Sequence, residues 1–249
     1  MKTVVLAAGY ATRLYPLTEN KPKALLPIGS KLLIDHLAQK IAGIIEPNQT
    51  IIVTNDRFYG AFDDWALVGA FKRAVVLNDR TTSNDDRLGA IGDFQFAIDK
   101  LRLDDDVLML ASDNLFDGSL GEFVRFARSK NGAPCVGVTD LGDPMKGSKR
   151  YGMIKLDGTG RITAIDEKPE KPQTPYASMG VYYFPRASLH LVREYLSSAQ
   201  KNDAPGHYVT WLLNKTSVYG FVFKGQWYDI GSIDQLNEAG REYERVRAH

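Results

Sequence analysis

Residues 4–14 of the chain read VVLAAGYATRL, and residues 21–23 read KPK. The apolar, β-branched residues at the start of this stretch predict a buried strand, which ends where the small residues begin. Small residues let a polyphosphate approach backbone N–H groups, and an arginine and a lysine close by neutralise its charge. The stretch therefore predicts a strand followed by a loop that binds a nucleoside triphosphate.

The composition is that of a globular protein with no strong net charge. The chain has 249 residues, of which 44% are hydrophobic, so one large α/β domain or one domain with an appended lobe fits its length. A formal net charge of +1 is too small to favour binding to nucleic acid or to an anionic membrane through overall electrostatic attraction. The single cysteine, Cys135, excludes an internal disulfide and a multi-cysteine zinc site. We find neither a signal-peptide pattern nor an apolar run of membrane-spanning length, so we expect a soluble, cytoplasmic protein.

Strand-like runs alternate with segments of helical period through the first 140 residues. Strands are predicted at 3–7, 50–54, 74–77, 107–111 and 134–139, and helices at 34–44, 62–71, 89–101 and 120–129. Such alternation predicts an α/β fold with a Rossmann-like, mostly parallel sheet covered by helices on both faces. Beyond residue 140, short strands separated by turn residues predict an antiparallel extension at 153–156, 162–165 and 181–184. Helices are again predicted at 187–198, 207–214 and 233–246, with a strand at 218–223.

The chemically suggestive residues follow the predicted parallel strands. Ligands of open parallel sheets bind beyond the carboxyl ends of the strands, where the loop after Ala8, the Ser112-Asp113-Asn114 turn and residues 79–93 are expected. The loop has neither the Gly-x-Gly-x-x-Gly of a dinucleotide site nor a P-loop motif. Asp113 ends a buried strand, where a carboxylate suits Mg²⁺ as a hard oxygen ligand or serves as a turn residue.

The order of these motifs resembles that of the sugar-1-phosphate nucleotidylyltransferases, the nucleotidyl-diphospho-sugar pyrophosphorylases such as glucose-1-phosphate thymidylyltransferase. The resemblance rests on residues 6–14, Lys21-Pro22-Lys23, Glu167-Lys168-Pro169 and Trp227-Tyr228-Asp229, and it extends to about Leu236. It implies the nucleotide-diphospho-sugar transferase fold in a single domain, 1–249. Residues 1–140 would form its nucleotide-binding half, and residues 141–249, with the antiparallel extension, its sugar-phosphate-binding half.

The resemblance also assigns roles to individual residues. It implies a Mg²⁺-dependent, in-line reaction of an NTP with a sugar 1-phosphate that gives an NDP-sugar and pyrophosphate. Arg13 would hold the departing β- and γ-phosphates, Lys23 the α-phosphoryl group and Lys168 the sugar phosphate, so these are the expected catalytic residues. The metal ligands would be Asp113 and Asp229. The nucleotide would be bound by Leu6, Ala8, Gly9, Thr12, Arg13 and Gly89, and the sugar phosphate by Gly152, Glu167, Lys168 and Gly180.

Several alternatives stay open for these residues. Asp229 could cap the last helix, Glu167 and Lys168 could form an exposed ion-paired hairpin, and Gly152 and Gly180 could serve as turn or bulge residues.

The chain departs from the family pattern at three places, and the identity of the base and of the acceptor therefore stays undetermined. Ala11 stands where the family usually has a second glycine, which matters if that position needs a positive φ. Residues 78–90 replace the usual base-reading segment and keep only a small-residue turn near Gly89. Lys23-Ala24-Leu25 also occurs in relatives that cytidylylate phosphocholine or other phosphorylated alcohols.

We expect glucose 1-phosphate with dTTP or UTP as the substrates. A cytidylyltransferase for a phosphorylated alcohol is the alternative, and an NDP-sugar-dependent glycosyltransferase is a more distant one. A non-catalytic nucleotide-binding module would be expected to lack Lys23, Asp113 or Asp229. Family members are often dimers or tetramers, so a homo-oligomer is compatible with the resemblance.

Overall fold

The computed structural model describes residues 1–68, 71–198 and 204–247. The chain forms two compact units, each assembled from separate stretches of sequence. The β1 unit consists of Lys2–Arg87, Ala111–Asp117 and Gly225–His249, and the β11 unit consists of Met1, Leu88–Leu110 and Gly118–Lys224. The expectation of one domain with halves that divide near residue 140 stays a prediction.

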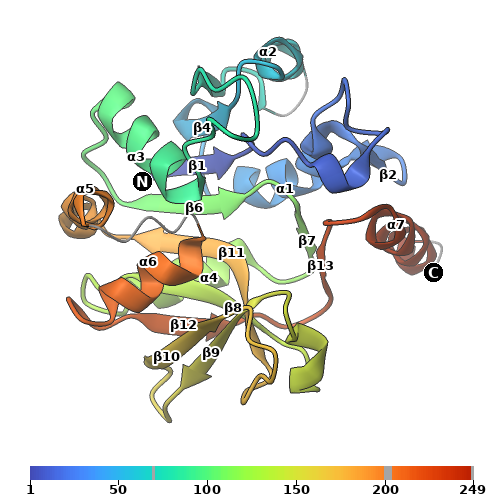
Figure 1. Ribbon diagram of the computed structural model, residues 1–249. Helices are drawn as coiled ribbons and strands as arrows, with labels where there is room; N and C mark the ends of the chain where they lie inside the picture. The colour runs from blue at the N-terminus through green and yellow to red at the C-terminus, as the bar shows by residue number, and fades with distance from the viewer. Residues whose placement is uncertain (69–70, 199–203, 248–249) are drawn as a thin grey trace. The chain divides into compact units, whose positions relative to one another are not determined.

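Three parallel strands form the centre of the β1 unit (Figure 1). They are β1 (Lys2–Leu6), β4 (Thr50–Thr54) and β5 (Val75–Asn78), with β4 paired to both of the others. Every residue of β4 is buried, as expected for a strand with neighbours on both sides and cover on both faces. Helix α2 (Tyr59–Leu67) packs against β5, and α1 (Leu33–Ala42) buries an apolar stripe with a helical period.

Short elements surround the ends of these strands in the β1 unit. Two short antiparallel pairs join β2 (Pro27–Ile28) to β3 (Lys31–Leu32) and β7 (Asn114–Phe116) to β13 (Trp227–Asp229). Two 3-10 turns, η1 (Thr12–Leu14) and η2 (Lys23–Leu25), follow β1, and α7 (Ile233–Arg247) packs on β2 and β13. One apolar cluster ties these elements together through Leu14, Leu26, Ile28, Leu33, Leu115, Ile230, Leu236 and Ala239.

The β11 unit is built around one long strand, β11 (Tyr176–Phe184). It pairs antiparallel with β6 (Val107–Ala111), β8 (Cys135–Asp140) and β9 (Gly152–Leu156). Strand β10 (Ile162–Glu167) extends β9 as an antiparallel hairpin, whereas β12 (Tyr219–Val222) adds to β8 in parallel.

Helices cover the strands of the β11 unit. Helices α3 (Ala90–Leu101), α5 (His190–Ser197) and α6 (Pro205–Leu212) pack on one another, and α6 also contacts β10. Helix α4 (Leu120–Arg128) lies against β12. Further 3-10 turns among the described residues are η5 (Pro144–Gly147) and η6 (Arg186–Ser188) in this unit and η3 (Pro47–Gln49) in the β1 unit.

The structure confirms the predicted α/β fold, with a mixed sheet flanked by helices and an antiparallel hairpin after residue 140. The helix expected at 187–198 is divided into η6 and α5, and the one expected at 62–71 is α2, with residues 69–70 outside the described part. The pairs β2–β3 and β7–β13 were not predicted, because strands of two or three residues are too short to show an alternating pattern.

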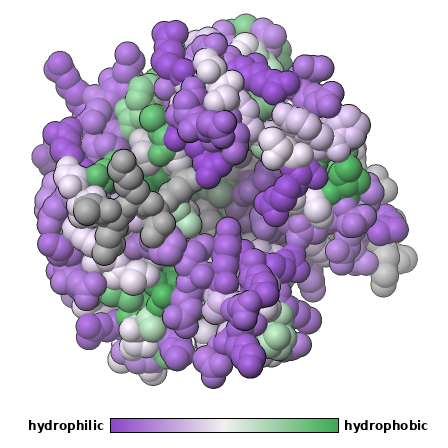
Figure 2. Space-filling view, viewed as in Figure 1, coloured by the Kyte–Doolittle hydropathy of each residue, from purple (hydrophilic) through white to green (hydrophobic). Residues whose placement is uncertain are grey.

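Among the described helices none is both long and apolar enough to span a membrane. The face of the molecule seen in Figure 2 is mainly hydrophilic, with small, scattered hydrophobic areas.

Candidate active site

The loop after β1 is held firmly by its neighbours in the β1 unit. The Ala7 N–H donates to the Val53 carbonyl at 2.8 Å, and the Asn55 side-chain amide donates to the Ala8 carbonyl at 2.9 Å. Gly9 is exposed, and a Cβ at this position would meet no heavy atom within 4 Å. The loop therefore offers open space at Gly9 on a fixed backbone, which suits the close approach of a polyphosphate.

Ala11 adopts the left-handed conformation, with φ 48° and ψ 41°. The position where the family usually has glycine thus does require a positive φ, which costs an alanine on the order of 1 kcal/mol. The Thr18 hydroxyl donates to the Ala11 carbonyl at 2.8 Å, and the Ala11 side chain packs against the apolar cluster. These contacts hold the turn that starts η1, from which Thr12 and Arg13 are exposed.

Arg13 extends toward the segment that follows β13. A Cβ at Gly231 would lie 3.5 Å from Arg13 Nη2, so the guanidinium lies against the Gly231 backbone. The structure therefore brings a cation of the first loop beside the residues that follow Asp229.

Lys23 forms an ion pair with Asp113. Pro22 is extended, and η2 begins directly after it with Lys23, whose Nζ lies 2.7 Å from Asp113 Oδ2. The two side chains are 17% and 27% exposed, so the pair is mostly removed from water. The structure thus joins two predicted site residues that are 90 positions apart in the chain.

Strands β7 and β13 place Asp113 next to Asp229. In their pairing Asp229 lies opposite Asn114, and the Ile230 N–H donates to the Asp113 carbonyl at 3.0 Å. The Asn114 side chain donates to Asp113 Oδ1 at 3.2 Å and accepts from the Trp227 indole at 2.7 Å. Backbone pairing therefore brings Asp113 and Asp229, both partly buried, close together in the β1 unit, and the side-chain network holds the Asp113 carboxylate.

This donor set fits Mg²⁺. Magnesium is usually held by one or two carboxylates, with substrate phosphates and water as its other ligands. Asp113 and Asp229 supply two carboxylates, and the Lys23 ammonium already pairs with one of them, which indicates a position that attracts positive charge. Among the described residues no group of three or more His, Cys, Asp or Glu side chains is arranged to hold a metal.

The segment between β5 and α3 is ordered by its own carboxylates. Asp79 Oδ1 accepts from the backbone N–H and the hydroxyl of Thr81, and the Thr81 hydroxyl lies 3.3 Å from the Tyr10 hydroxyl. Asp86 accepts from the backbone N–H groups of Thr82 and Ser83, which lower its pKa to about 2. The segment that replaces the usual base-reading sequence is therefore a structured loop beside Tyr10.

The predicted sugar-phosphate residues lie in the β11 unit. Glu167 ends β10 directly opposite Gly152 of β9, and the Lys168 N–H donates to the Tyr151 carbonyl at 3.0 Å. Lys168 itself is exposed and has a φ of 49°. Gly180 has a φ of 70° and lies where the β11–β8 register shifts. The geometry of Gly180 is thus that of a bulge residue, which was one of its two interpretations.

Gly89 forms the N-cap of α3, with a φ of 80°. Cys135 is buried in β8, where burial raises the pKa of its thiol to about 12, so it serves as a packed apolar side chain.

Two residues near Glu167 were not predicted from the sequence. Gly206 and His207 lie in the first turn of α6, and a Cβ at Gly206 would lie 1.9 Å from Glu167 Oε2. Burial raises the pKa of Glu167, while the positive charges of Lys168 and His207 oppose that shift. The only sequence signal was a Pro-Gly pair at a helix start, which normally indicates just the start itself.

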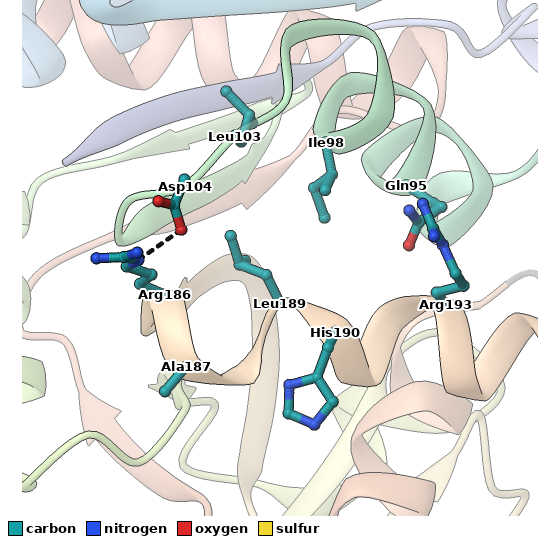
Figure 3. Close-up of a pocket in the computed structure, with 9 residues that line it drawn as sticks. All are labelled: Gln95, Ile98, Leu103, Asp104, Arg186, Ala187, Leu189, His190 and Arg193. Carbon is teal, nitrogen blue, oxygen red and sulfur yellow. Dashed lines mark hydrogen bonds and ion pairs between the residues drawn. The ribbon is translucent and has the colours of Figure 1, made fainter.

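A separate pocket of about 660 Å³ lies in the β11 unit between α3, η6 and α5 (Figure 3). Ile98 and Leu189 line it, and Arg186 at its edge pairs with Asp104 at 2.5 Å. No residue predicted for the site lines this pocket.

Comparisons with known proteins identify the family of the chain and proteins of similar fold. A family described as nucleotidyl transferase matches residues 2–246. A candidate glucose-1-phosphate thymidylyltransferase from Bacillus anthracis, solved in complex with sucrose, has a TM-score of 0.82 at 23% identity, over 97% of this chain and 94% of that chain.

Two structures of UDP-glucose pyrophosphorylase are also similar, both at 20% identity. The complex with UDP-glucose has a TM-score of 0.80 over 98% of each chain, and the apo form has 0.78 over 99% of each chain. At these identities the likeness shows a shared fold.

Proposed function

The chain belongs to the nucleotidyl transferase family, and from this premise we propose that it transfers a nucleotidyl group from an NTP to a sugar 1-phosphate, with release of pyrophosphate. The observation that carries the proposal is the Lys23–Asp113 ion pair, set beside Asp229 by the β7–β13 pairing. One cation and two carboxylates on fixed backbone are what phosphoryl chemistry requires of a protein, namely positioning and neutralisation of charge.

The residues of the β1 unit would bind different parts of the triphosphate. Gly9 leaves room for phosphate oxygens beside the backbone, and the exposed Arg13 neutralises the departing β- and γ-phosphates. Lys23 stabilises the charge on the α-phosphoryl group while the sugar phosphate attacks in line. Mg²⁺ held by Asp113 and Asp229 would offset further negative charge on the phosphates.

The residues of the β11 unit would recognise the acceptor. Glu167 accepts hydrogen bonds from hydroxyl groups, and Lys168 attracts the phosphate. Glu167 and Lys168 place a carboxylate and an ammonium next to each other, a pair suited to an acceptor that carries both hydroxyl groups and a phosphate. We therefore infer a sugar 1-phosphate, with glucose 1-phosphate as the first candidate.

The base is proposed to be thymine or uracil, as in our first expectation. The structural neighbours include a candidate thymidylyltransferase and a UDP-glucose pyrophosphorylase, which supports both bases equally. A cytoplasmic location and a homo-oligomeric state also remain predictions from the sequence.

Pyrophosphate release from each of the NTPs, with and without glucose 1-phosphate, other sugar 1-phosphates or phosphocholine, tests the proposal. We expect release only when an NTP and a sugar 1-phosphate are both present. Release with phosphocholine and CTP would support the alternative, and release without any acceptor would contradict a transferase. Asp113→Asn is the matched inactive variant, and Asp63→Asn, an exposed change on α2, is its control.

A further inference from the structure

The Glu167 carboxylate occupies a space that two glycines leave open. A Cβ at Gly206 would lie 1.9 Å from Glu167 Oε2, and a Cβ at Gly152 would lie 3.0 Å from the same oxygen. Real Cβ atoms essentially never come closer than 3.0 Å to another heavy atom. The carboxylate oxygen therefore takes the volume that any other residue at position 206 would fill with its side chain.

Helix α6 is anchored by contacts that oppose its movement away from Glu167. Tyr208 is fully buried, and its ring centroid lies 5.1 Å from that of Tyr195 and 5.7 Å from that of Phe184. The Thr210 hydroxyl contacts the Ile165 carbonyl of β10 at 3.5 Å. If a side chain were added at Gly206, the flexible end of Glu167 would have to yield rather than the helix.

The carboxylate has acceptor capacity to spare. It is half-buried, and within the described part of the chain no side chain or backbone N–H donates a hydrogen bond to it. The charged groups that face it are Lys168, next to it in the chain, and His207 on α6. A half-buried carboxylate without protein donors is suited to accept hydrogen bonds from a hydroxylated ligand.

We propose that Gly206 is a positioning residue, which holds the Glu167 carboxylate where it receives the hydroxyl groups of the sugar phosphate. The inference rests on the proposed function, because it takes Glu167 as an acceptor-binding group. It identifies the first turn of α6 as a determinant of acceptor recognition that acts through Glu167. His207, on the same turn of α6, is one of the two charged groups that oppose the rise in the Glu167 pKa caused by burial.

The test is Gly206→Ala in the full-length protein. Alanine favours the helix more than glycine does, and the displaced atom is the end of a flexible side chain, so we expect the fold to be retained. The KM for the sugar 1-phosphate should rise about tenfold to a hundredfold, the range for one lost hydrogen bond to a charged group, while the KM for the NTP stays within about twofold. Gly158→Ala is the control, because a Cβ there meets no heavy atom within 4 Å.

A second pair of variants separates positioning from a general structural effect. If Gly206 acts through Glu167, then Gly206→Ala should leave the acceptor KM unchanged in a Glu167→Ala background. A full additional effect in that background would overturn the proposal.

His207→Gln tests the same arrangement without adding bulk. Loss of a positive charge near Glu167 should move the acid limb of kcat/KM for the acceptor to higher pH, because the carboxylate then ionises less readily. An unmoved acid limb would contradict the role of His207. If Gly206→Ala does not fold, the double variant with Glu167→Ala should fold again, because the added methyl group then has no carboxylate to displace, and failure to fold would overturn the proposal.

Different results would contradict the proposed function and the role of Gly206. A wild-type protein that releases no pyrophosphate with any NTP and acceptor contradicts the proposed function. An active wild type whose acceptor KM is unaffected by Gly206→Ala contradicts only the role of Gly206.

Discussion

Removal of the Lys23 ammonium should expose how strongly the candidate site depends on charge balance. Lys23→Met keeps most of the apolar length of the side chain but leaves Asp113 beside Asp229 without its cation. Exposed ion pairs contribute about 0–1 kcal/mol, and loss of one partner of a fully buried pair costs about 3–5 kcal/mol. With side chains that are 17% and 27% exposed, the Lys23–Asp113 pair lies between these limits, so we expect a loss of about 2 kcal/mol.

Urea unfolding of a double-mutant cycle measures this quantity. The cycle compares Lys23→Met, Asp113→Asn and the double variant with the wild type, and a coupling energy of about 1–2 kcal/mol is expected for two groups whose charged atoms are 2.7 Å apart. Lys21→Met, an exposed change in the same loop, serves as the control and should be neutral. Single-variant effects that add to within about 0.5 kcal/mol would refute the assigned ion pair.

The same variants separate stability from chemistry. The double variant has neither the unpaired carboxylate nor the unpaired ammonium, so it should recover part of the lost stability. Its turnover should stay at least about 10²-fold below that of the wild type, because both groups belong to the proposed machinery. Mg²⁺ should also stabilise Lys23→Met more than the wild type, because it supplies the missing positive charge.

Three further changes test other parts of the structure. Arg13→Ala should lower turnover about 10²-fold or more in the pyrophosphate assay. The melting temperature should stay unchanged, because this side chain is exposed, and a fall in both turnover and melting temperature would contradict a purely functional role. Tyr208→Phe should be neutral or stabilising by about 1 kcal/mol in thermal melts, because the buried hydroxyl has no hydrogen-bond partner among the described residues, and a clear loss would reveal a partner. Asp86→Asn should speed amide hydrogen exchange at Thr82 and Ser83 at neutral pH. The pKa of Asp86 is lowered to about 2, so its ordering effect is complete above its usual value near 3.8 and is lost as pH falls through 2; unchanged exchange at neutral pH would count against it.

Features carried by a continuous stretch of sequence were predictable. The strand and loop of residues 4–14, the buried run that ends before Asp113 and the hairpin that ends at Glu167 each have a local pattern. Hydrophobic periodicity and small residues report such features directly, because their physical causes lie between neighbours in the chain.

Features that depend on distant partners were not predictable. The proximity of Asp113 and Asp229 depends on two three-residue strands, which are too short to have a pattern of their own. The contact between Gly206 and Glu167 depends on how α6 packs on β10, which no spacing of residues records. The sequence showed that Ala11 replaces a usual glycine but could not show whether that position has a positive φ. The backbone conformation shows that it does.

The interleaved path of the chain has a consequence for the order in which the protein is made. Once residue 224 has been synthesised, every strand of the β11 unit is present, whereas the β1 unit still lacks β13 and α7. Chains are translated from the N-terminus, and their segments fold as they become available. A ribosome-bound chain at that stage already carries Lys23 and Asp113 but not Asp229, so the candidate centre can form only after the described strands of the β11 unit have been made.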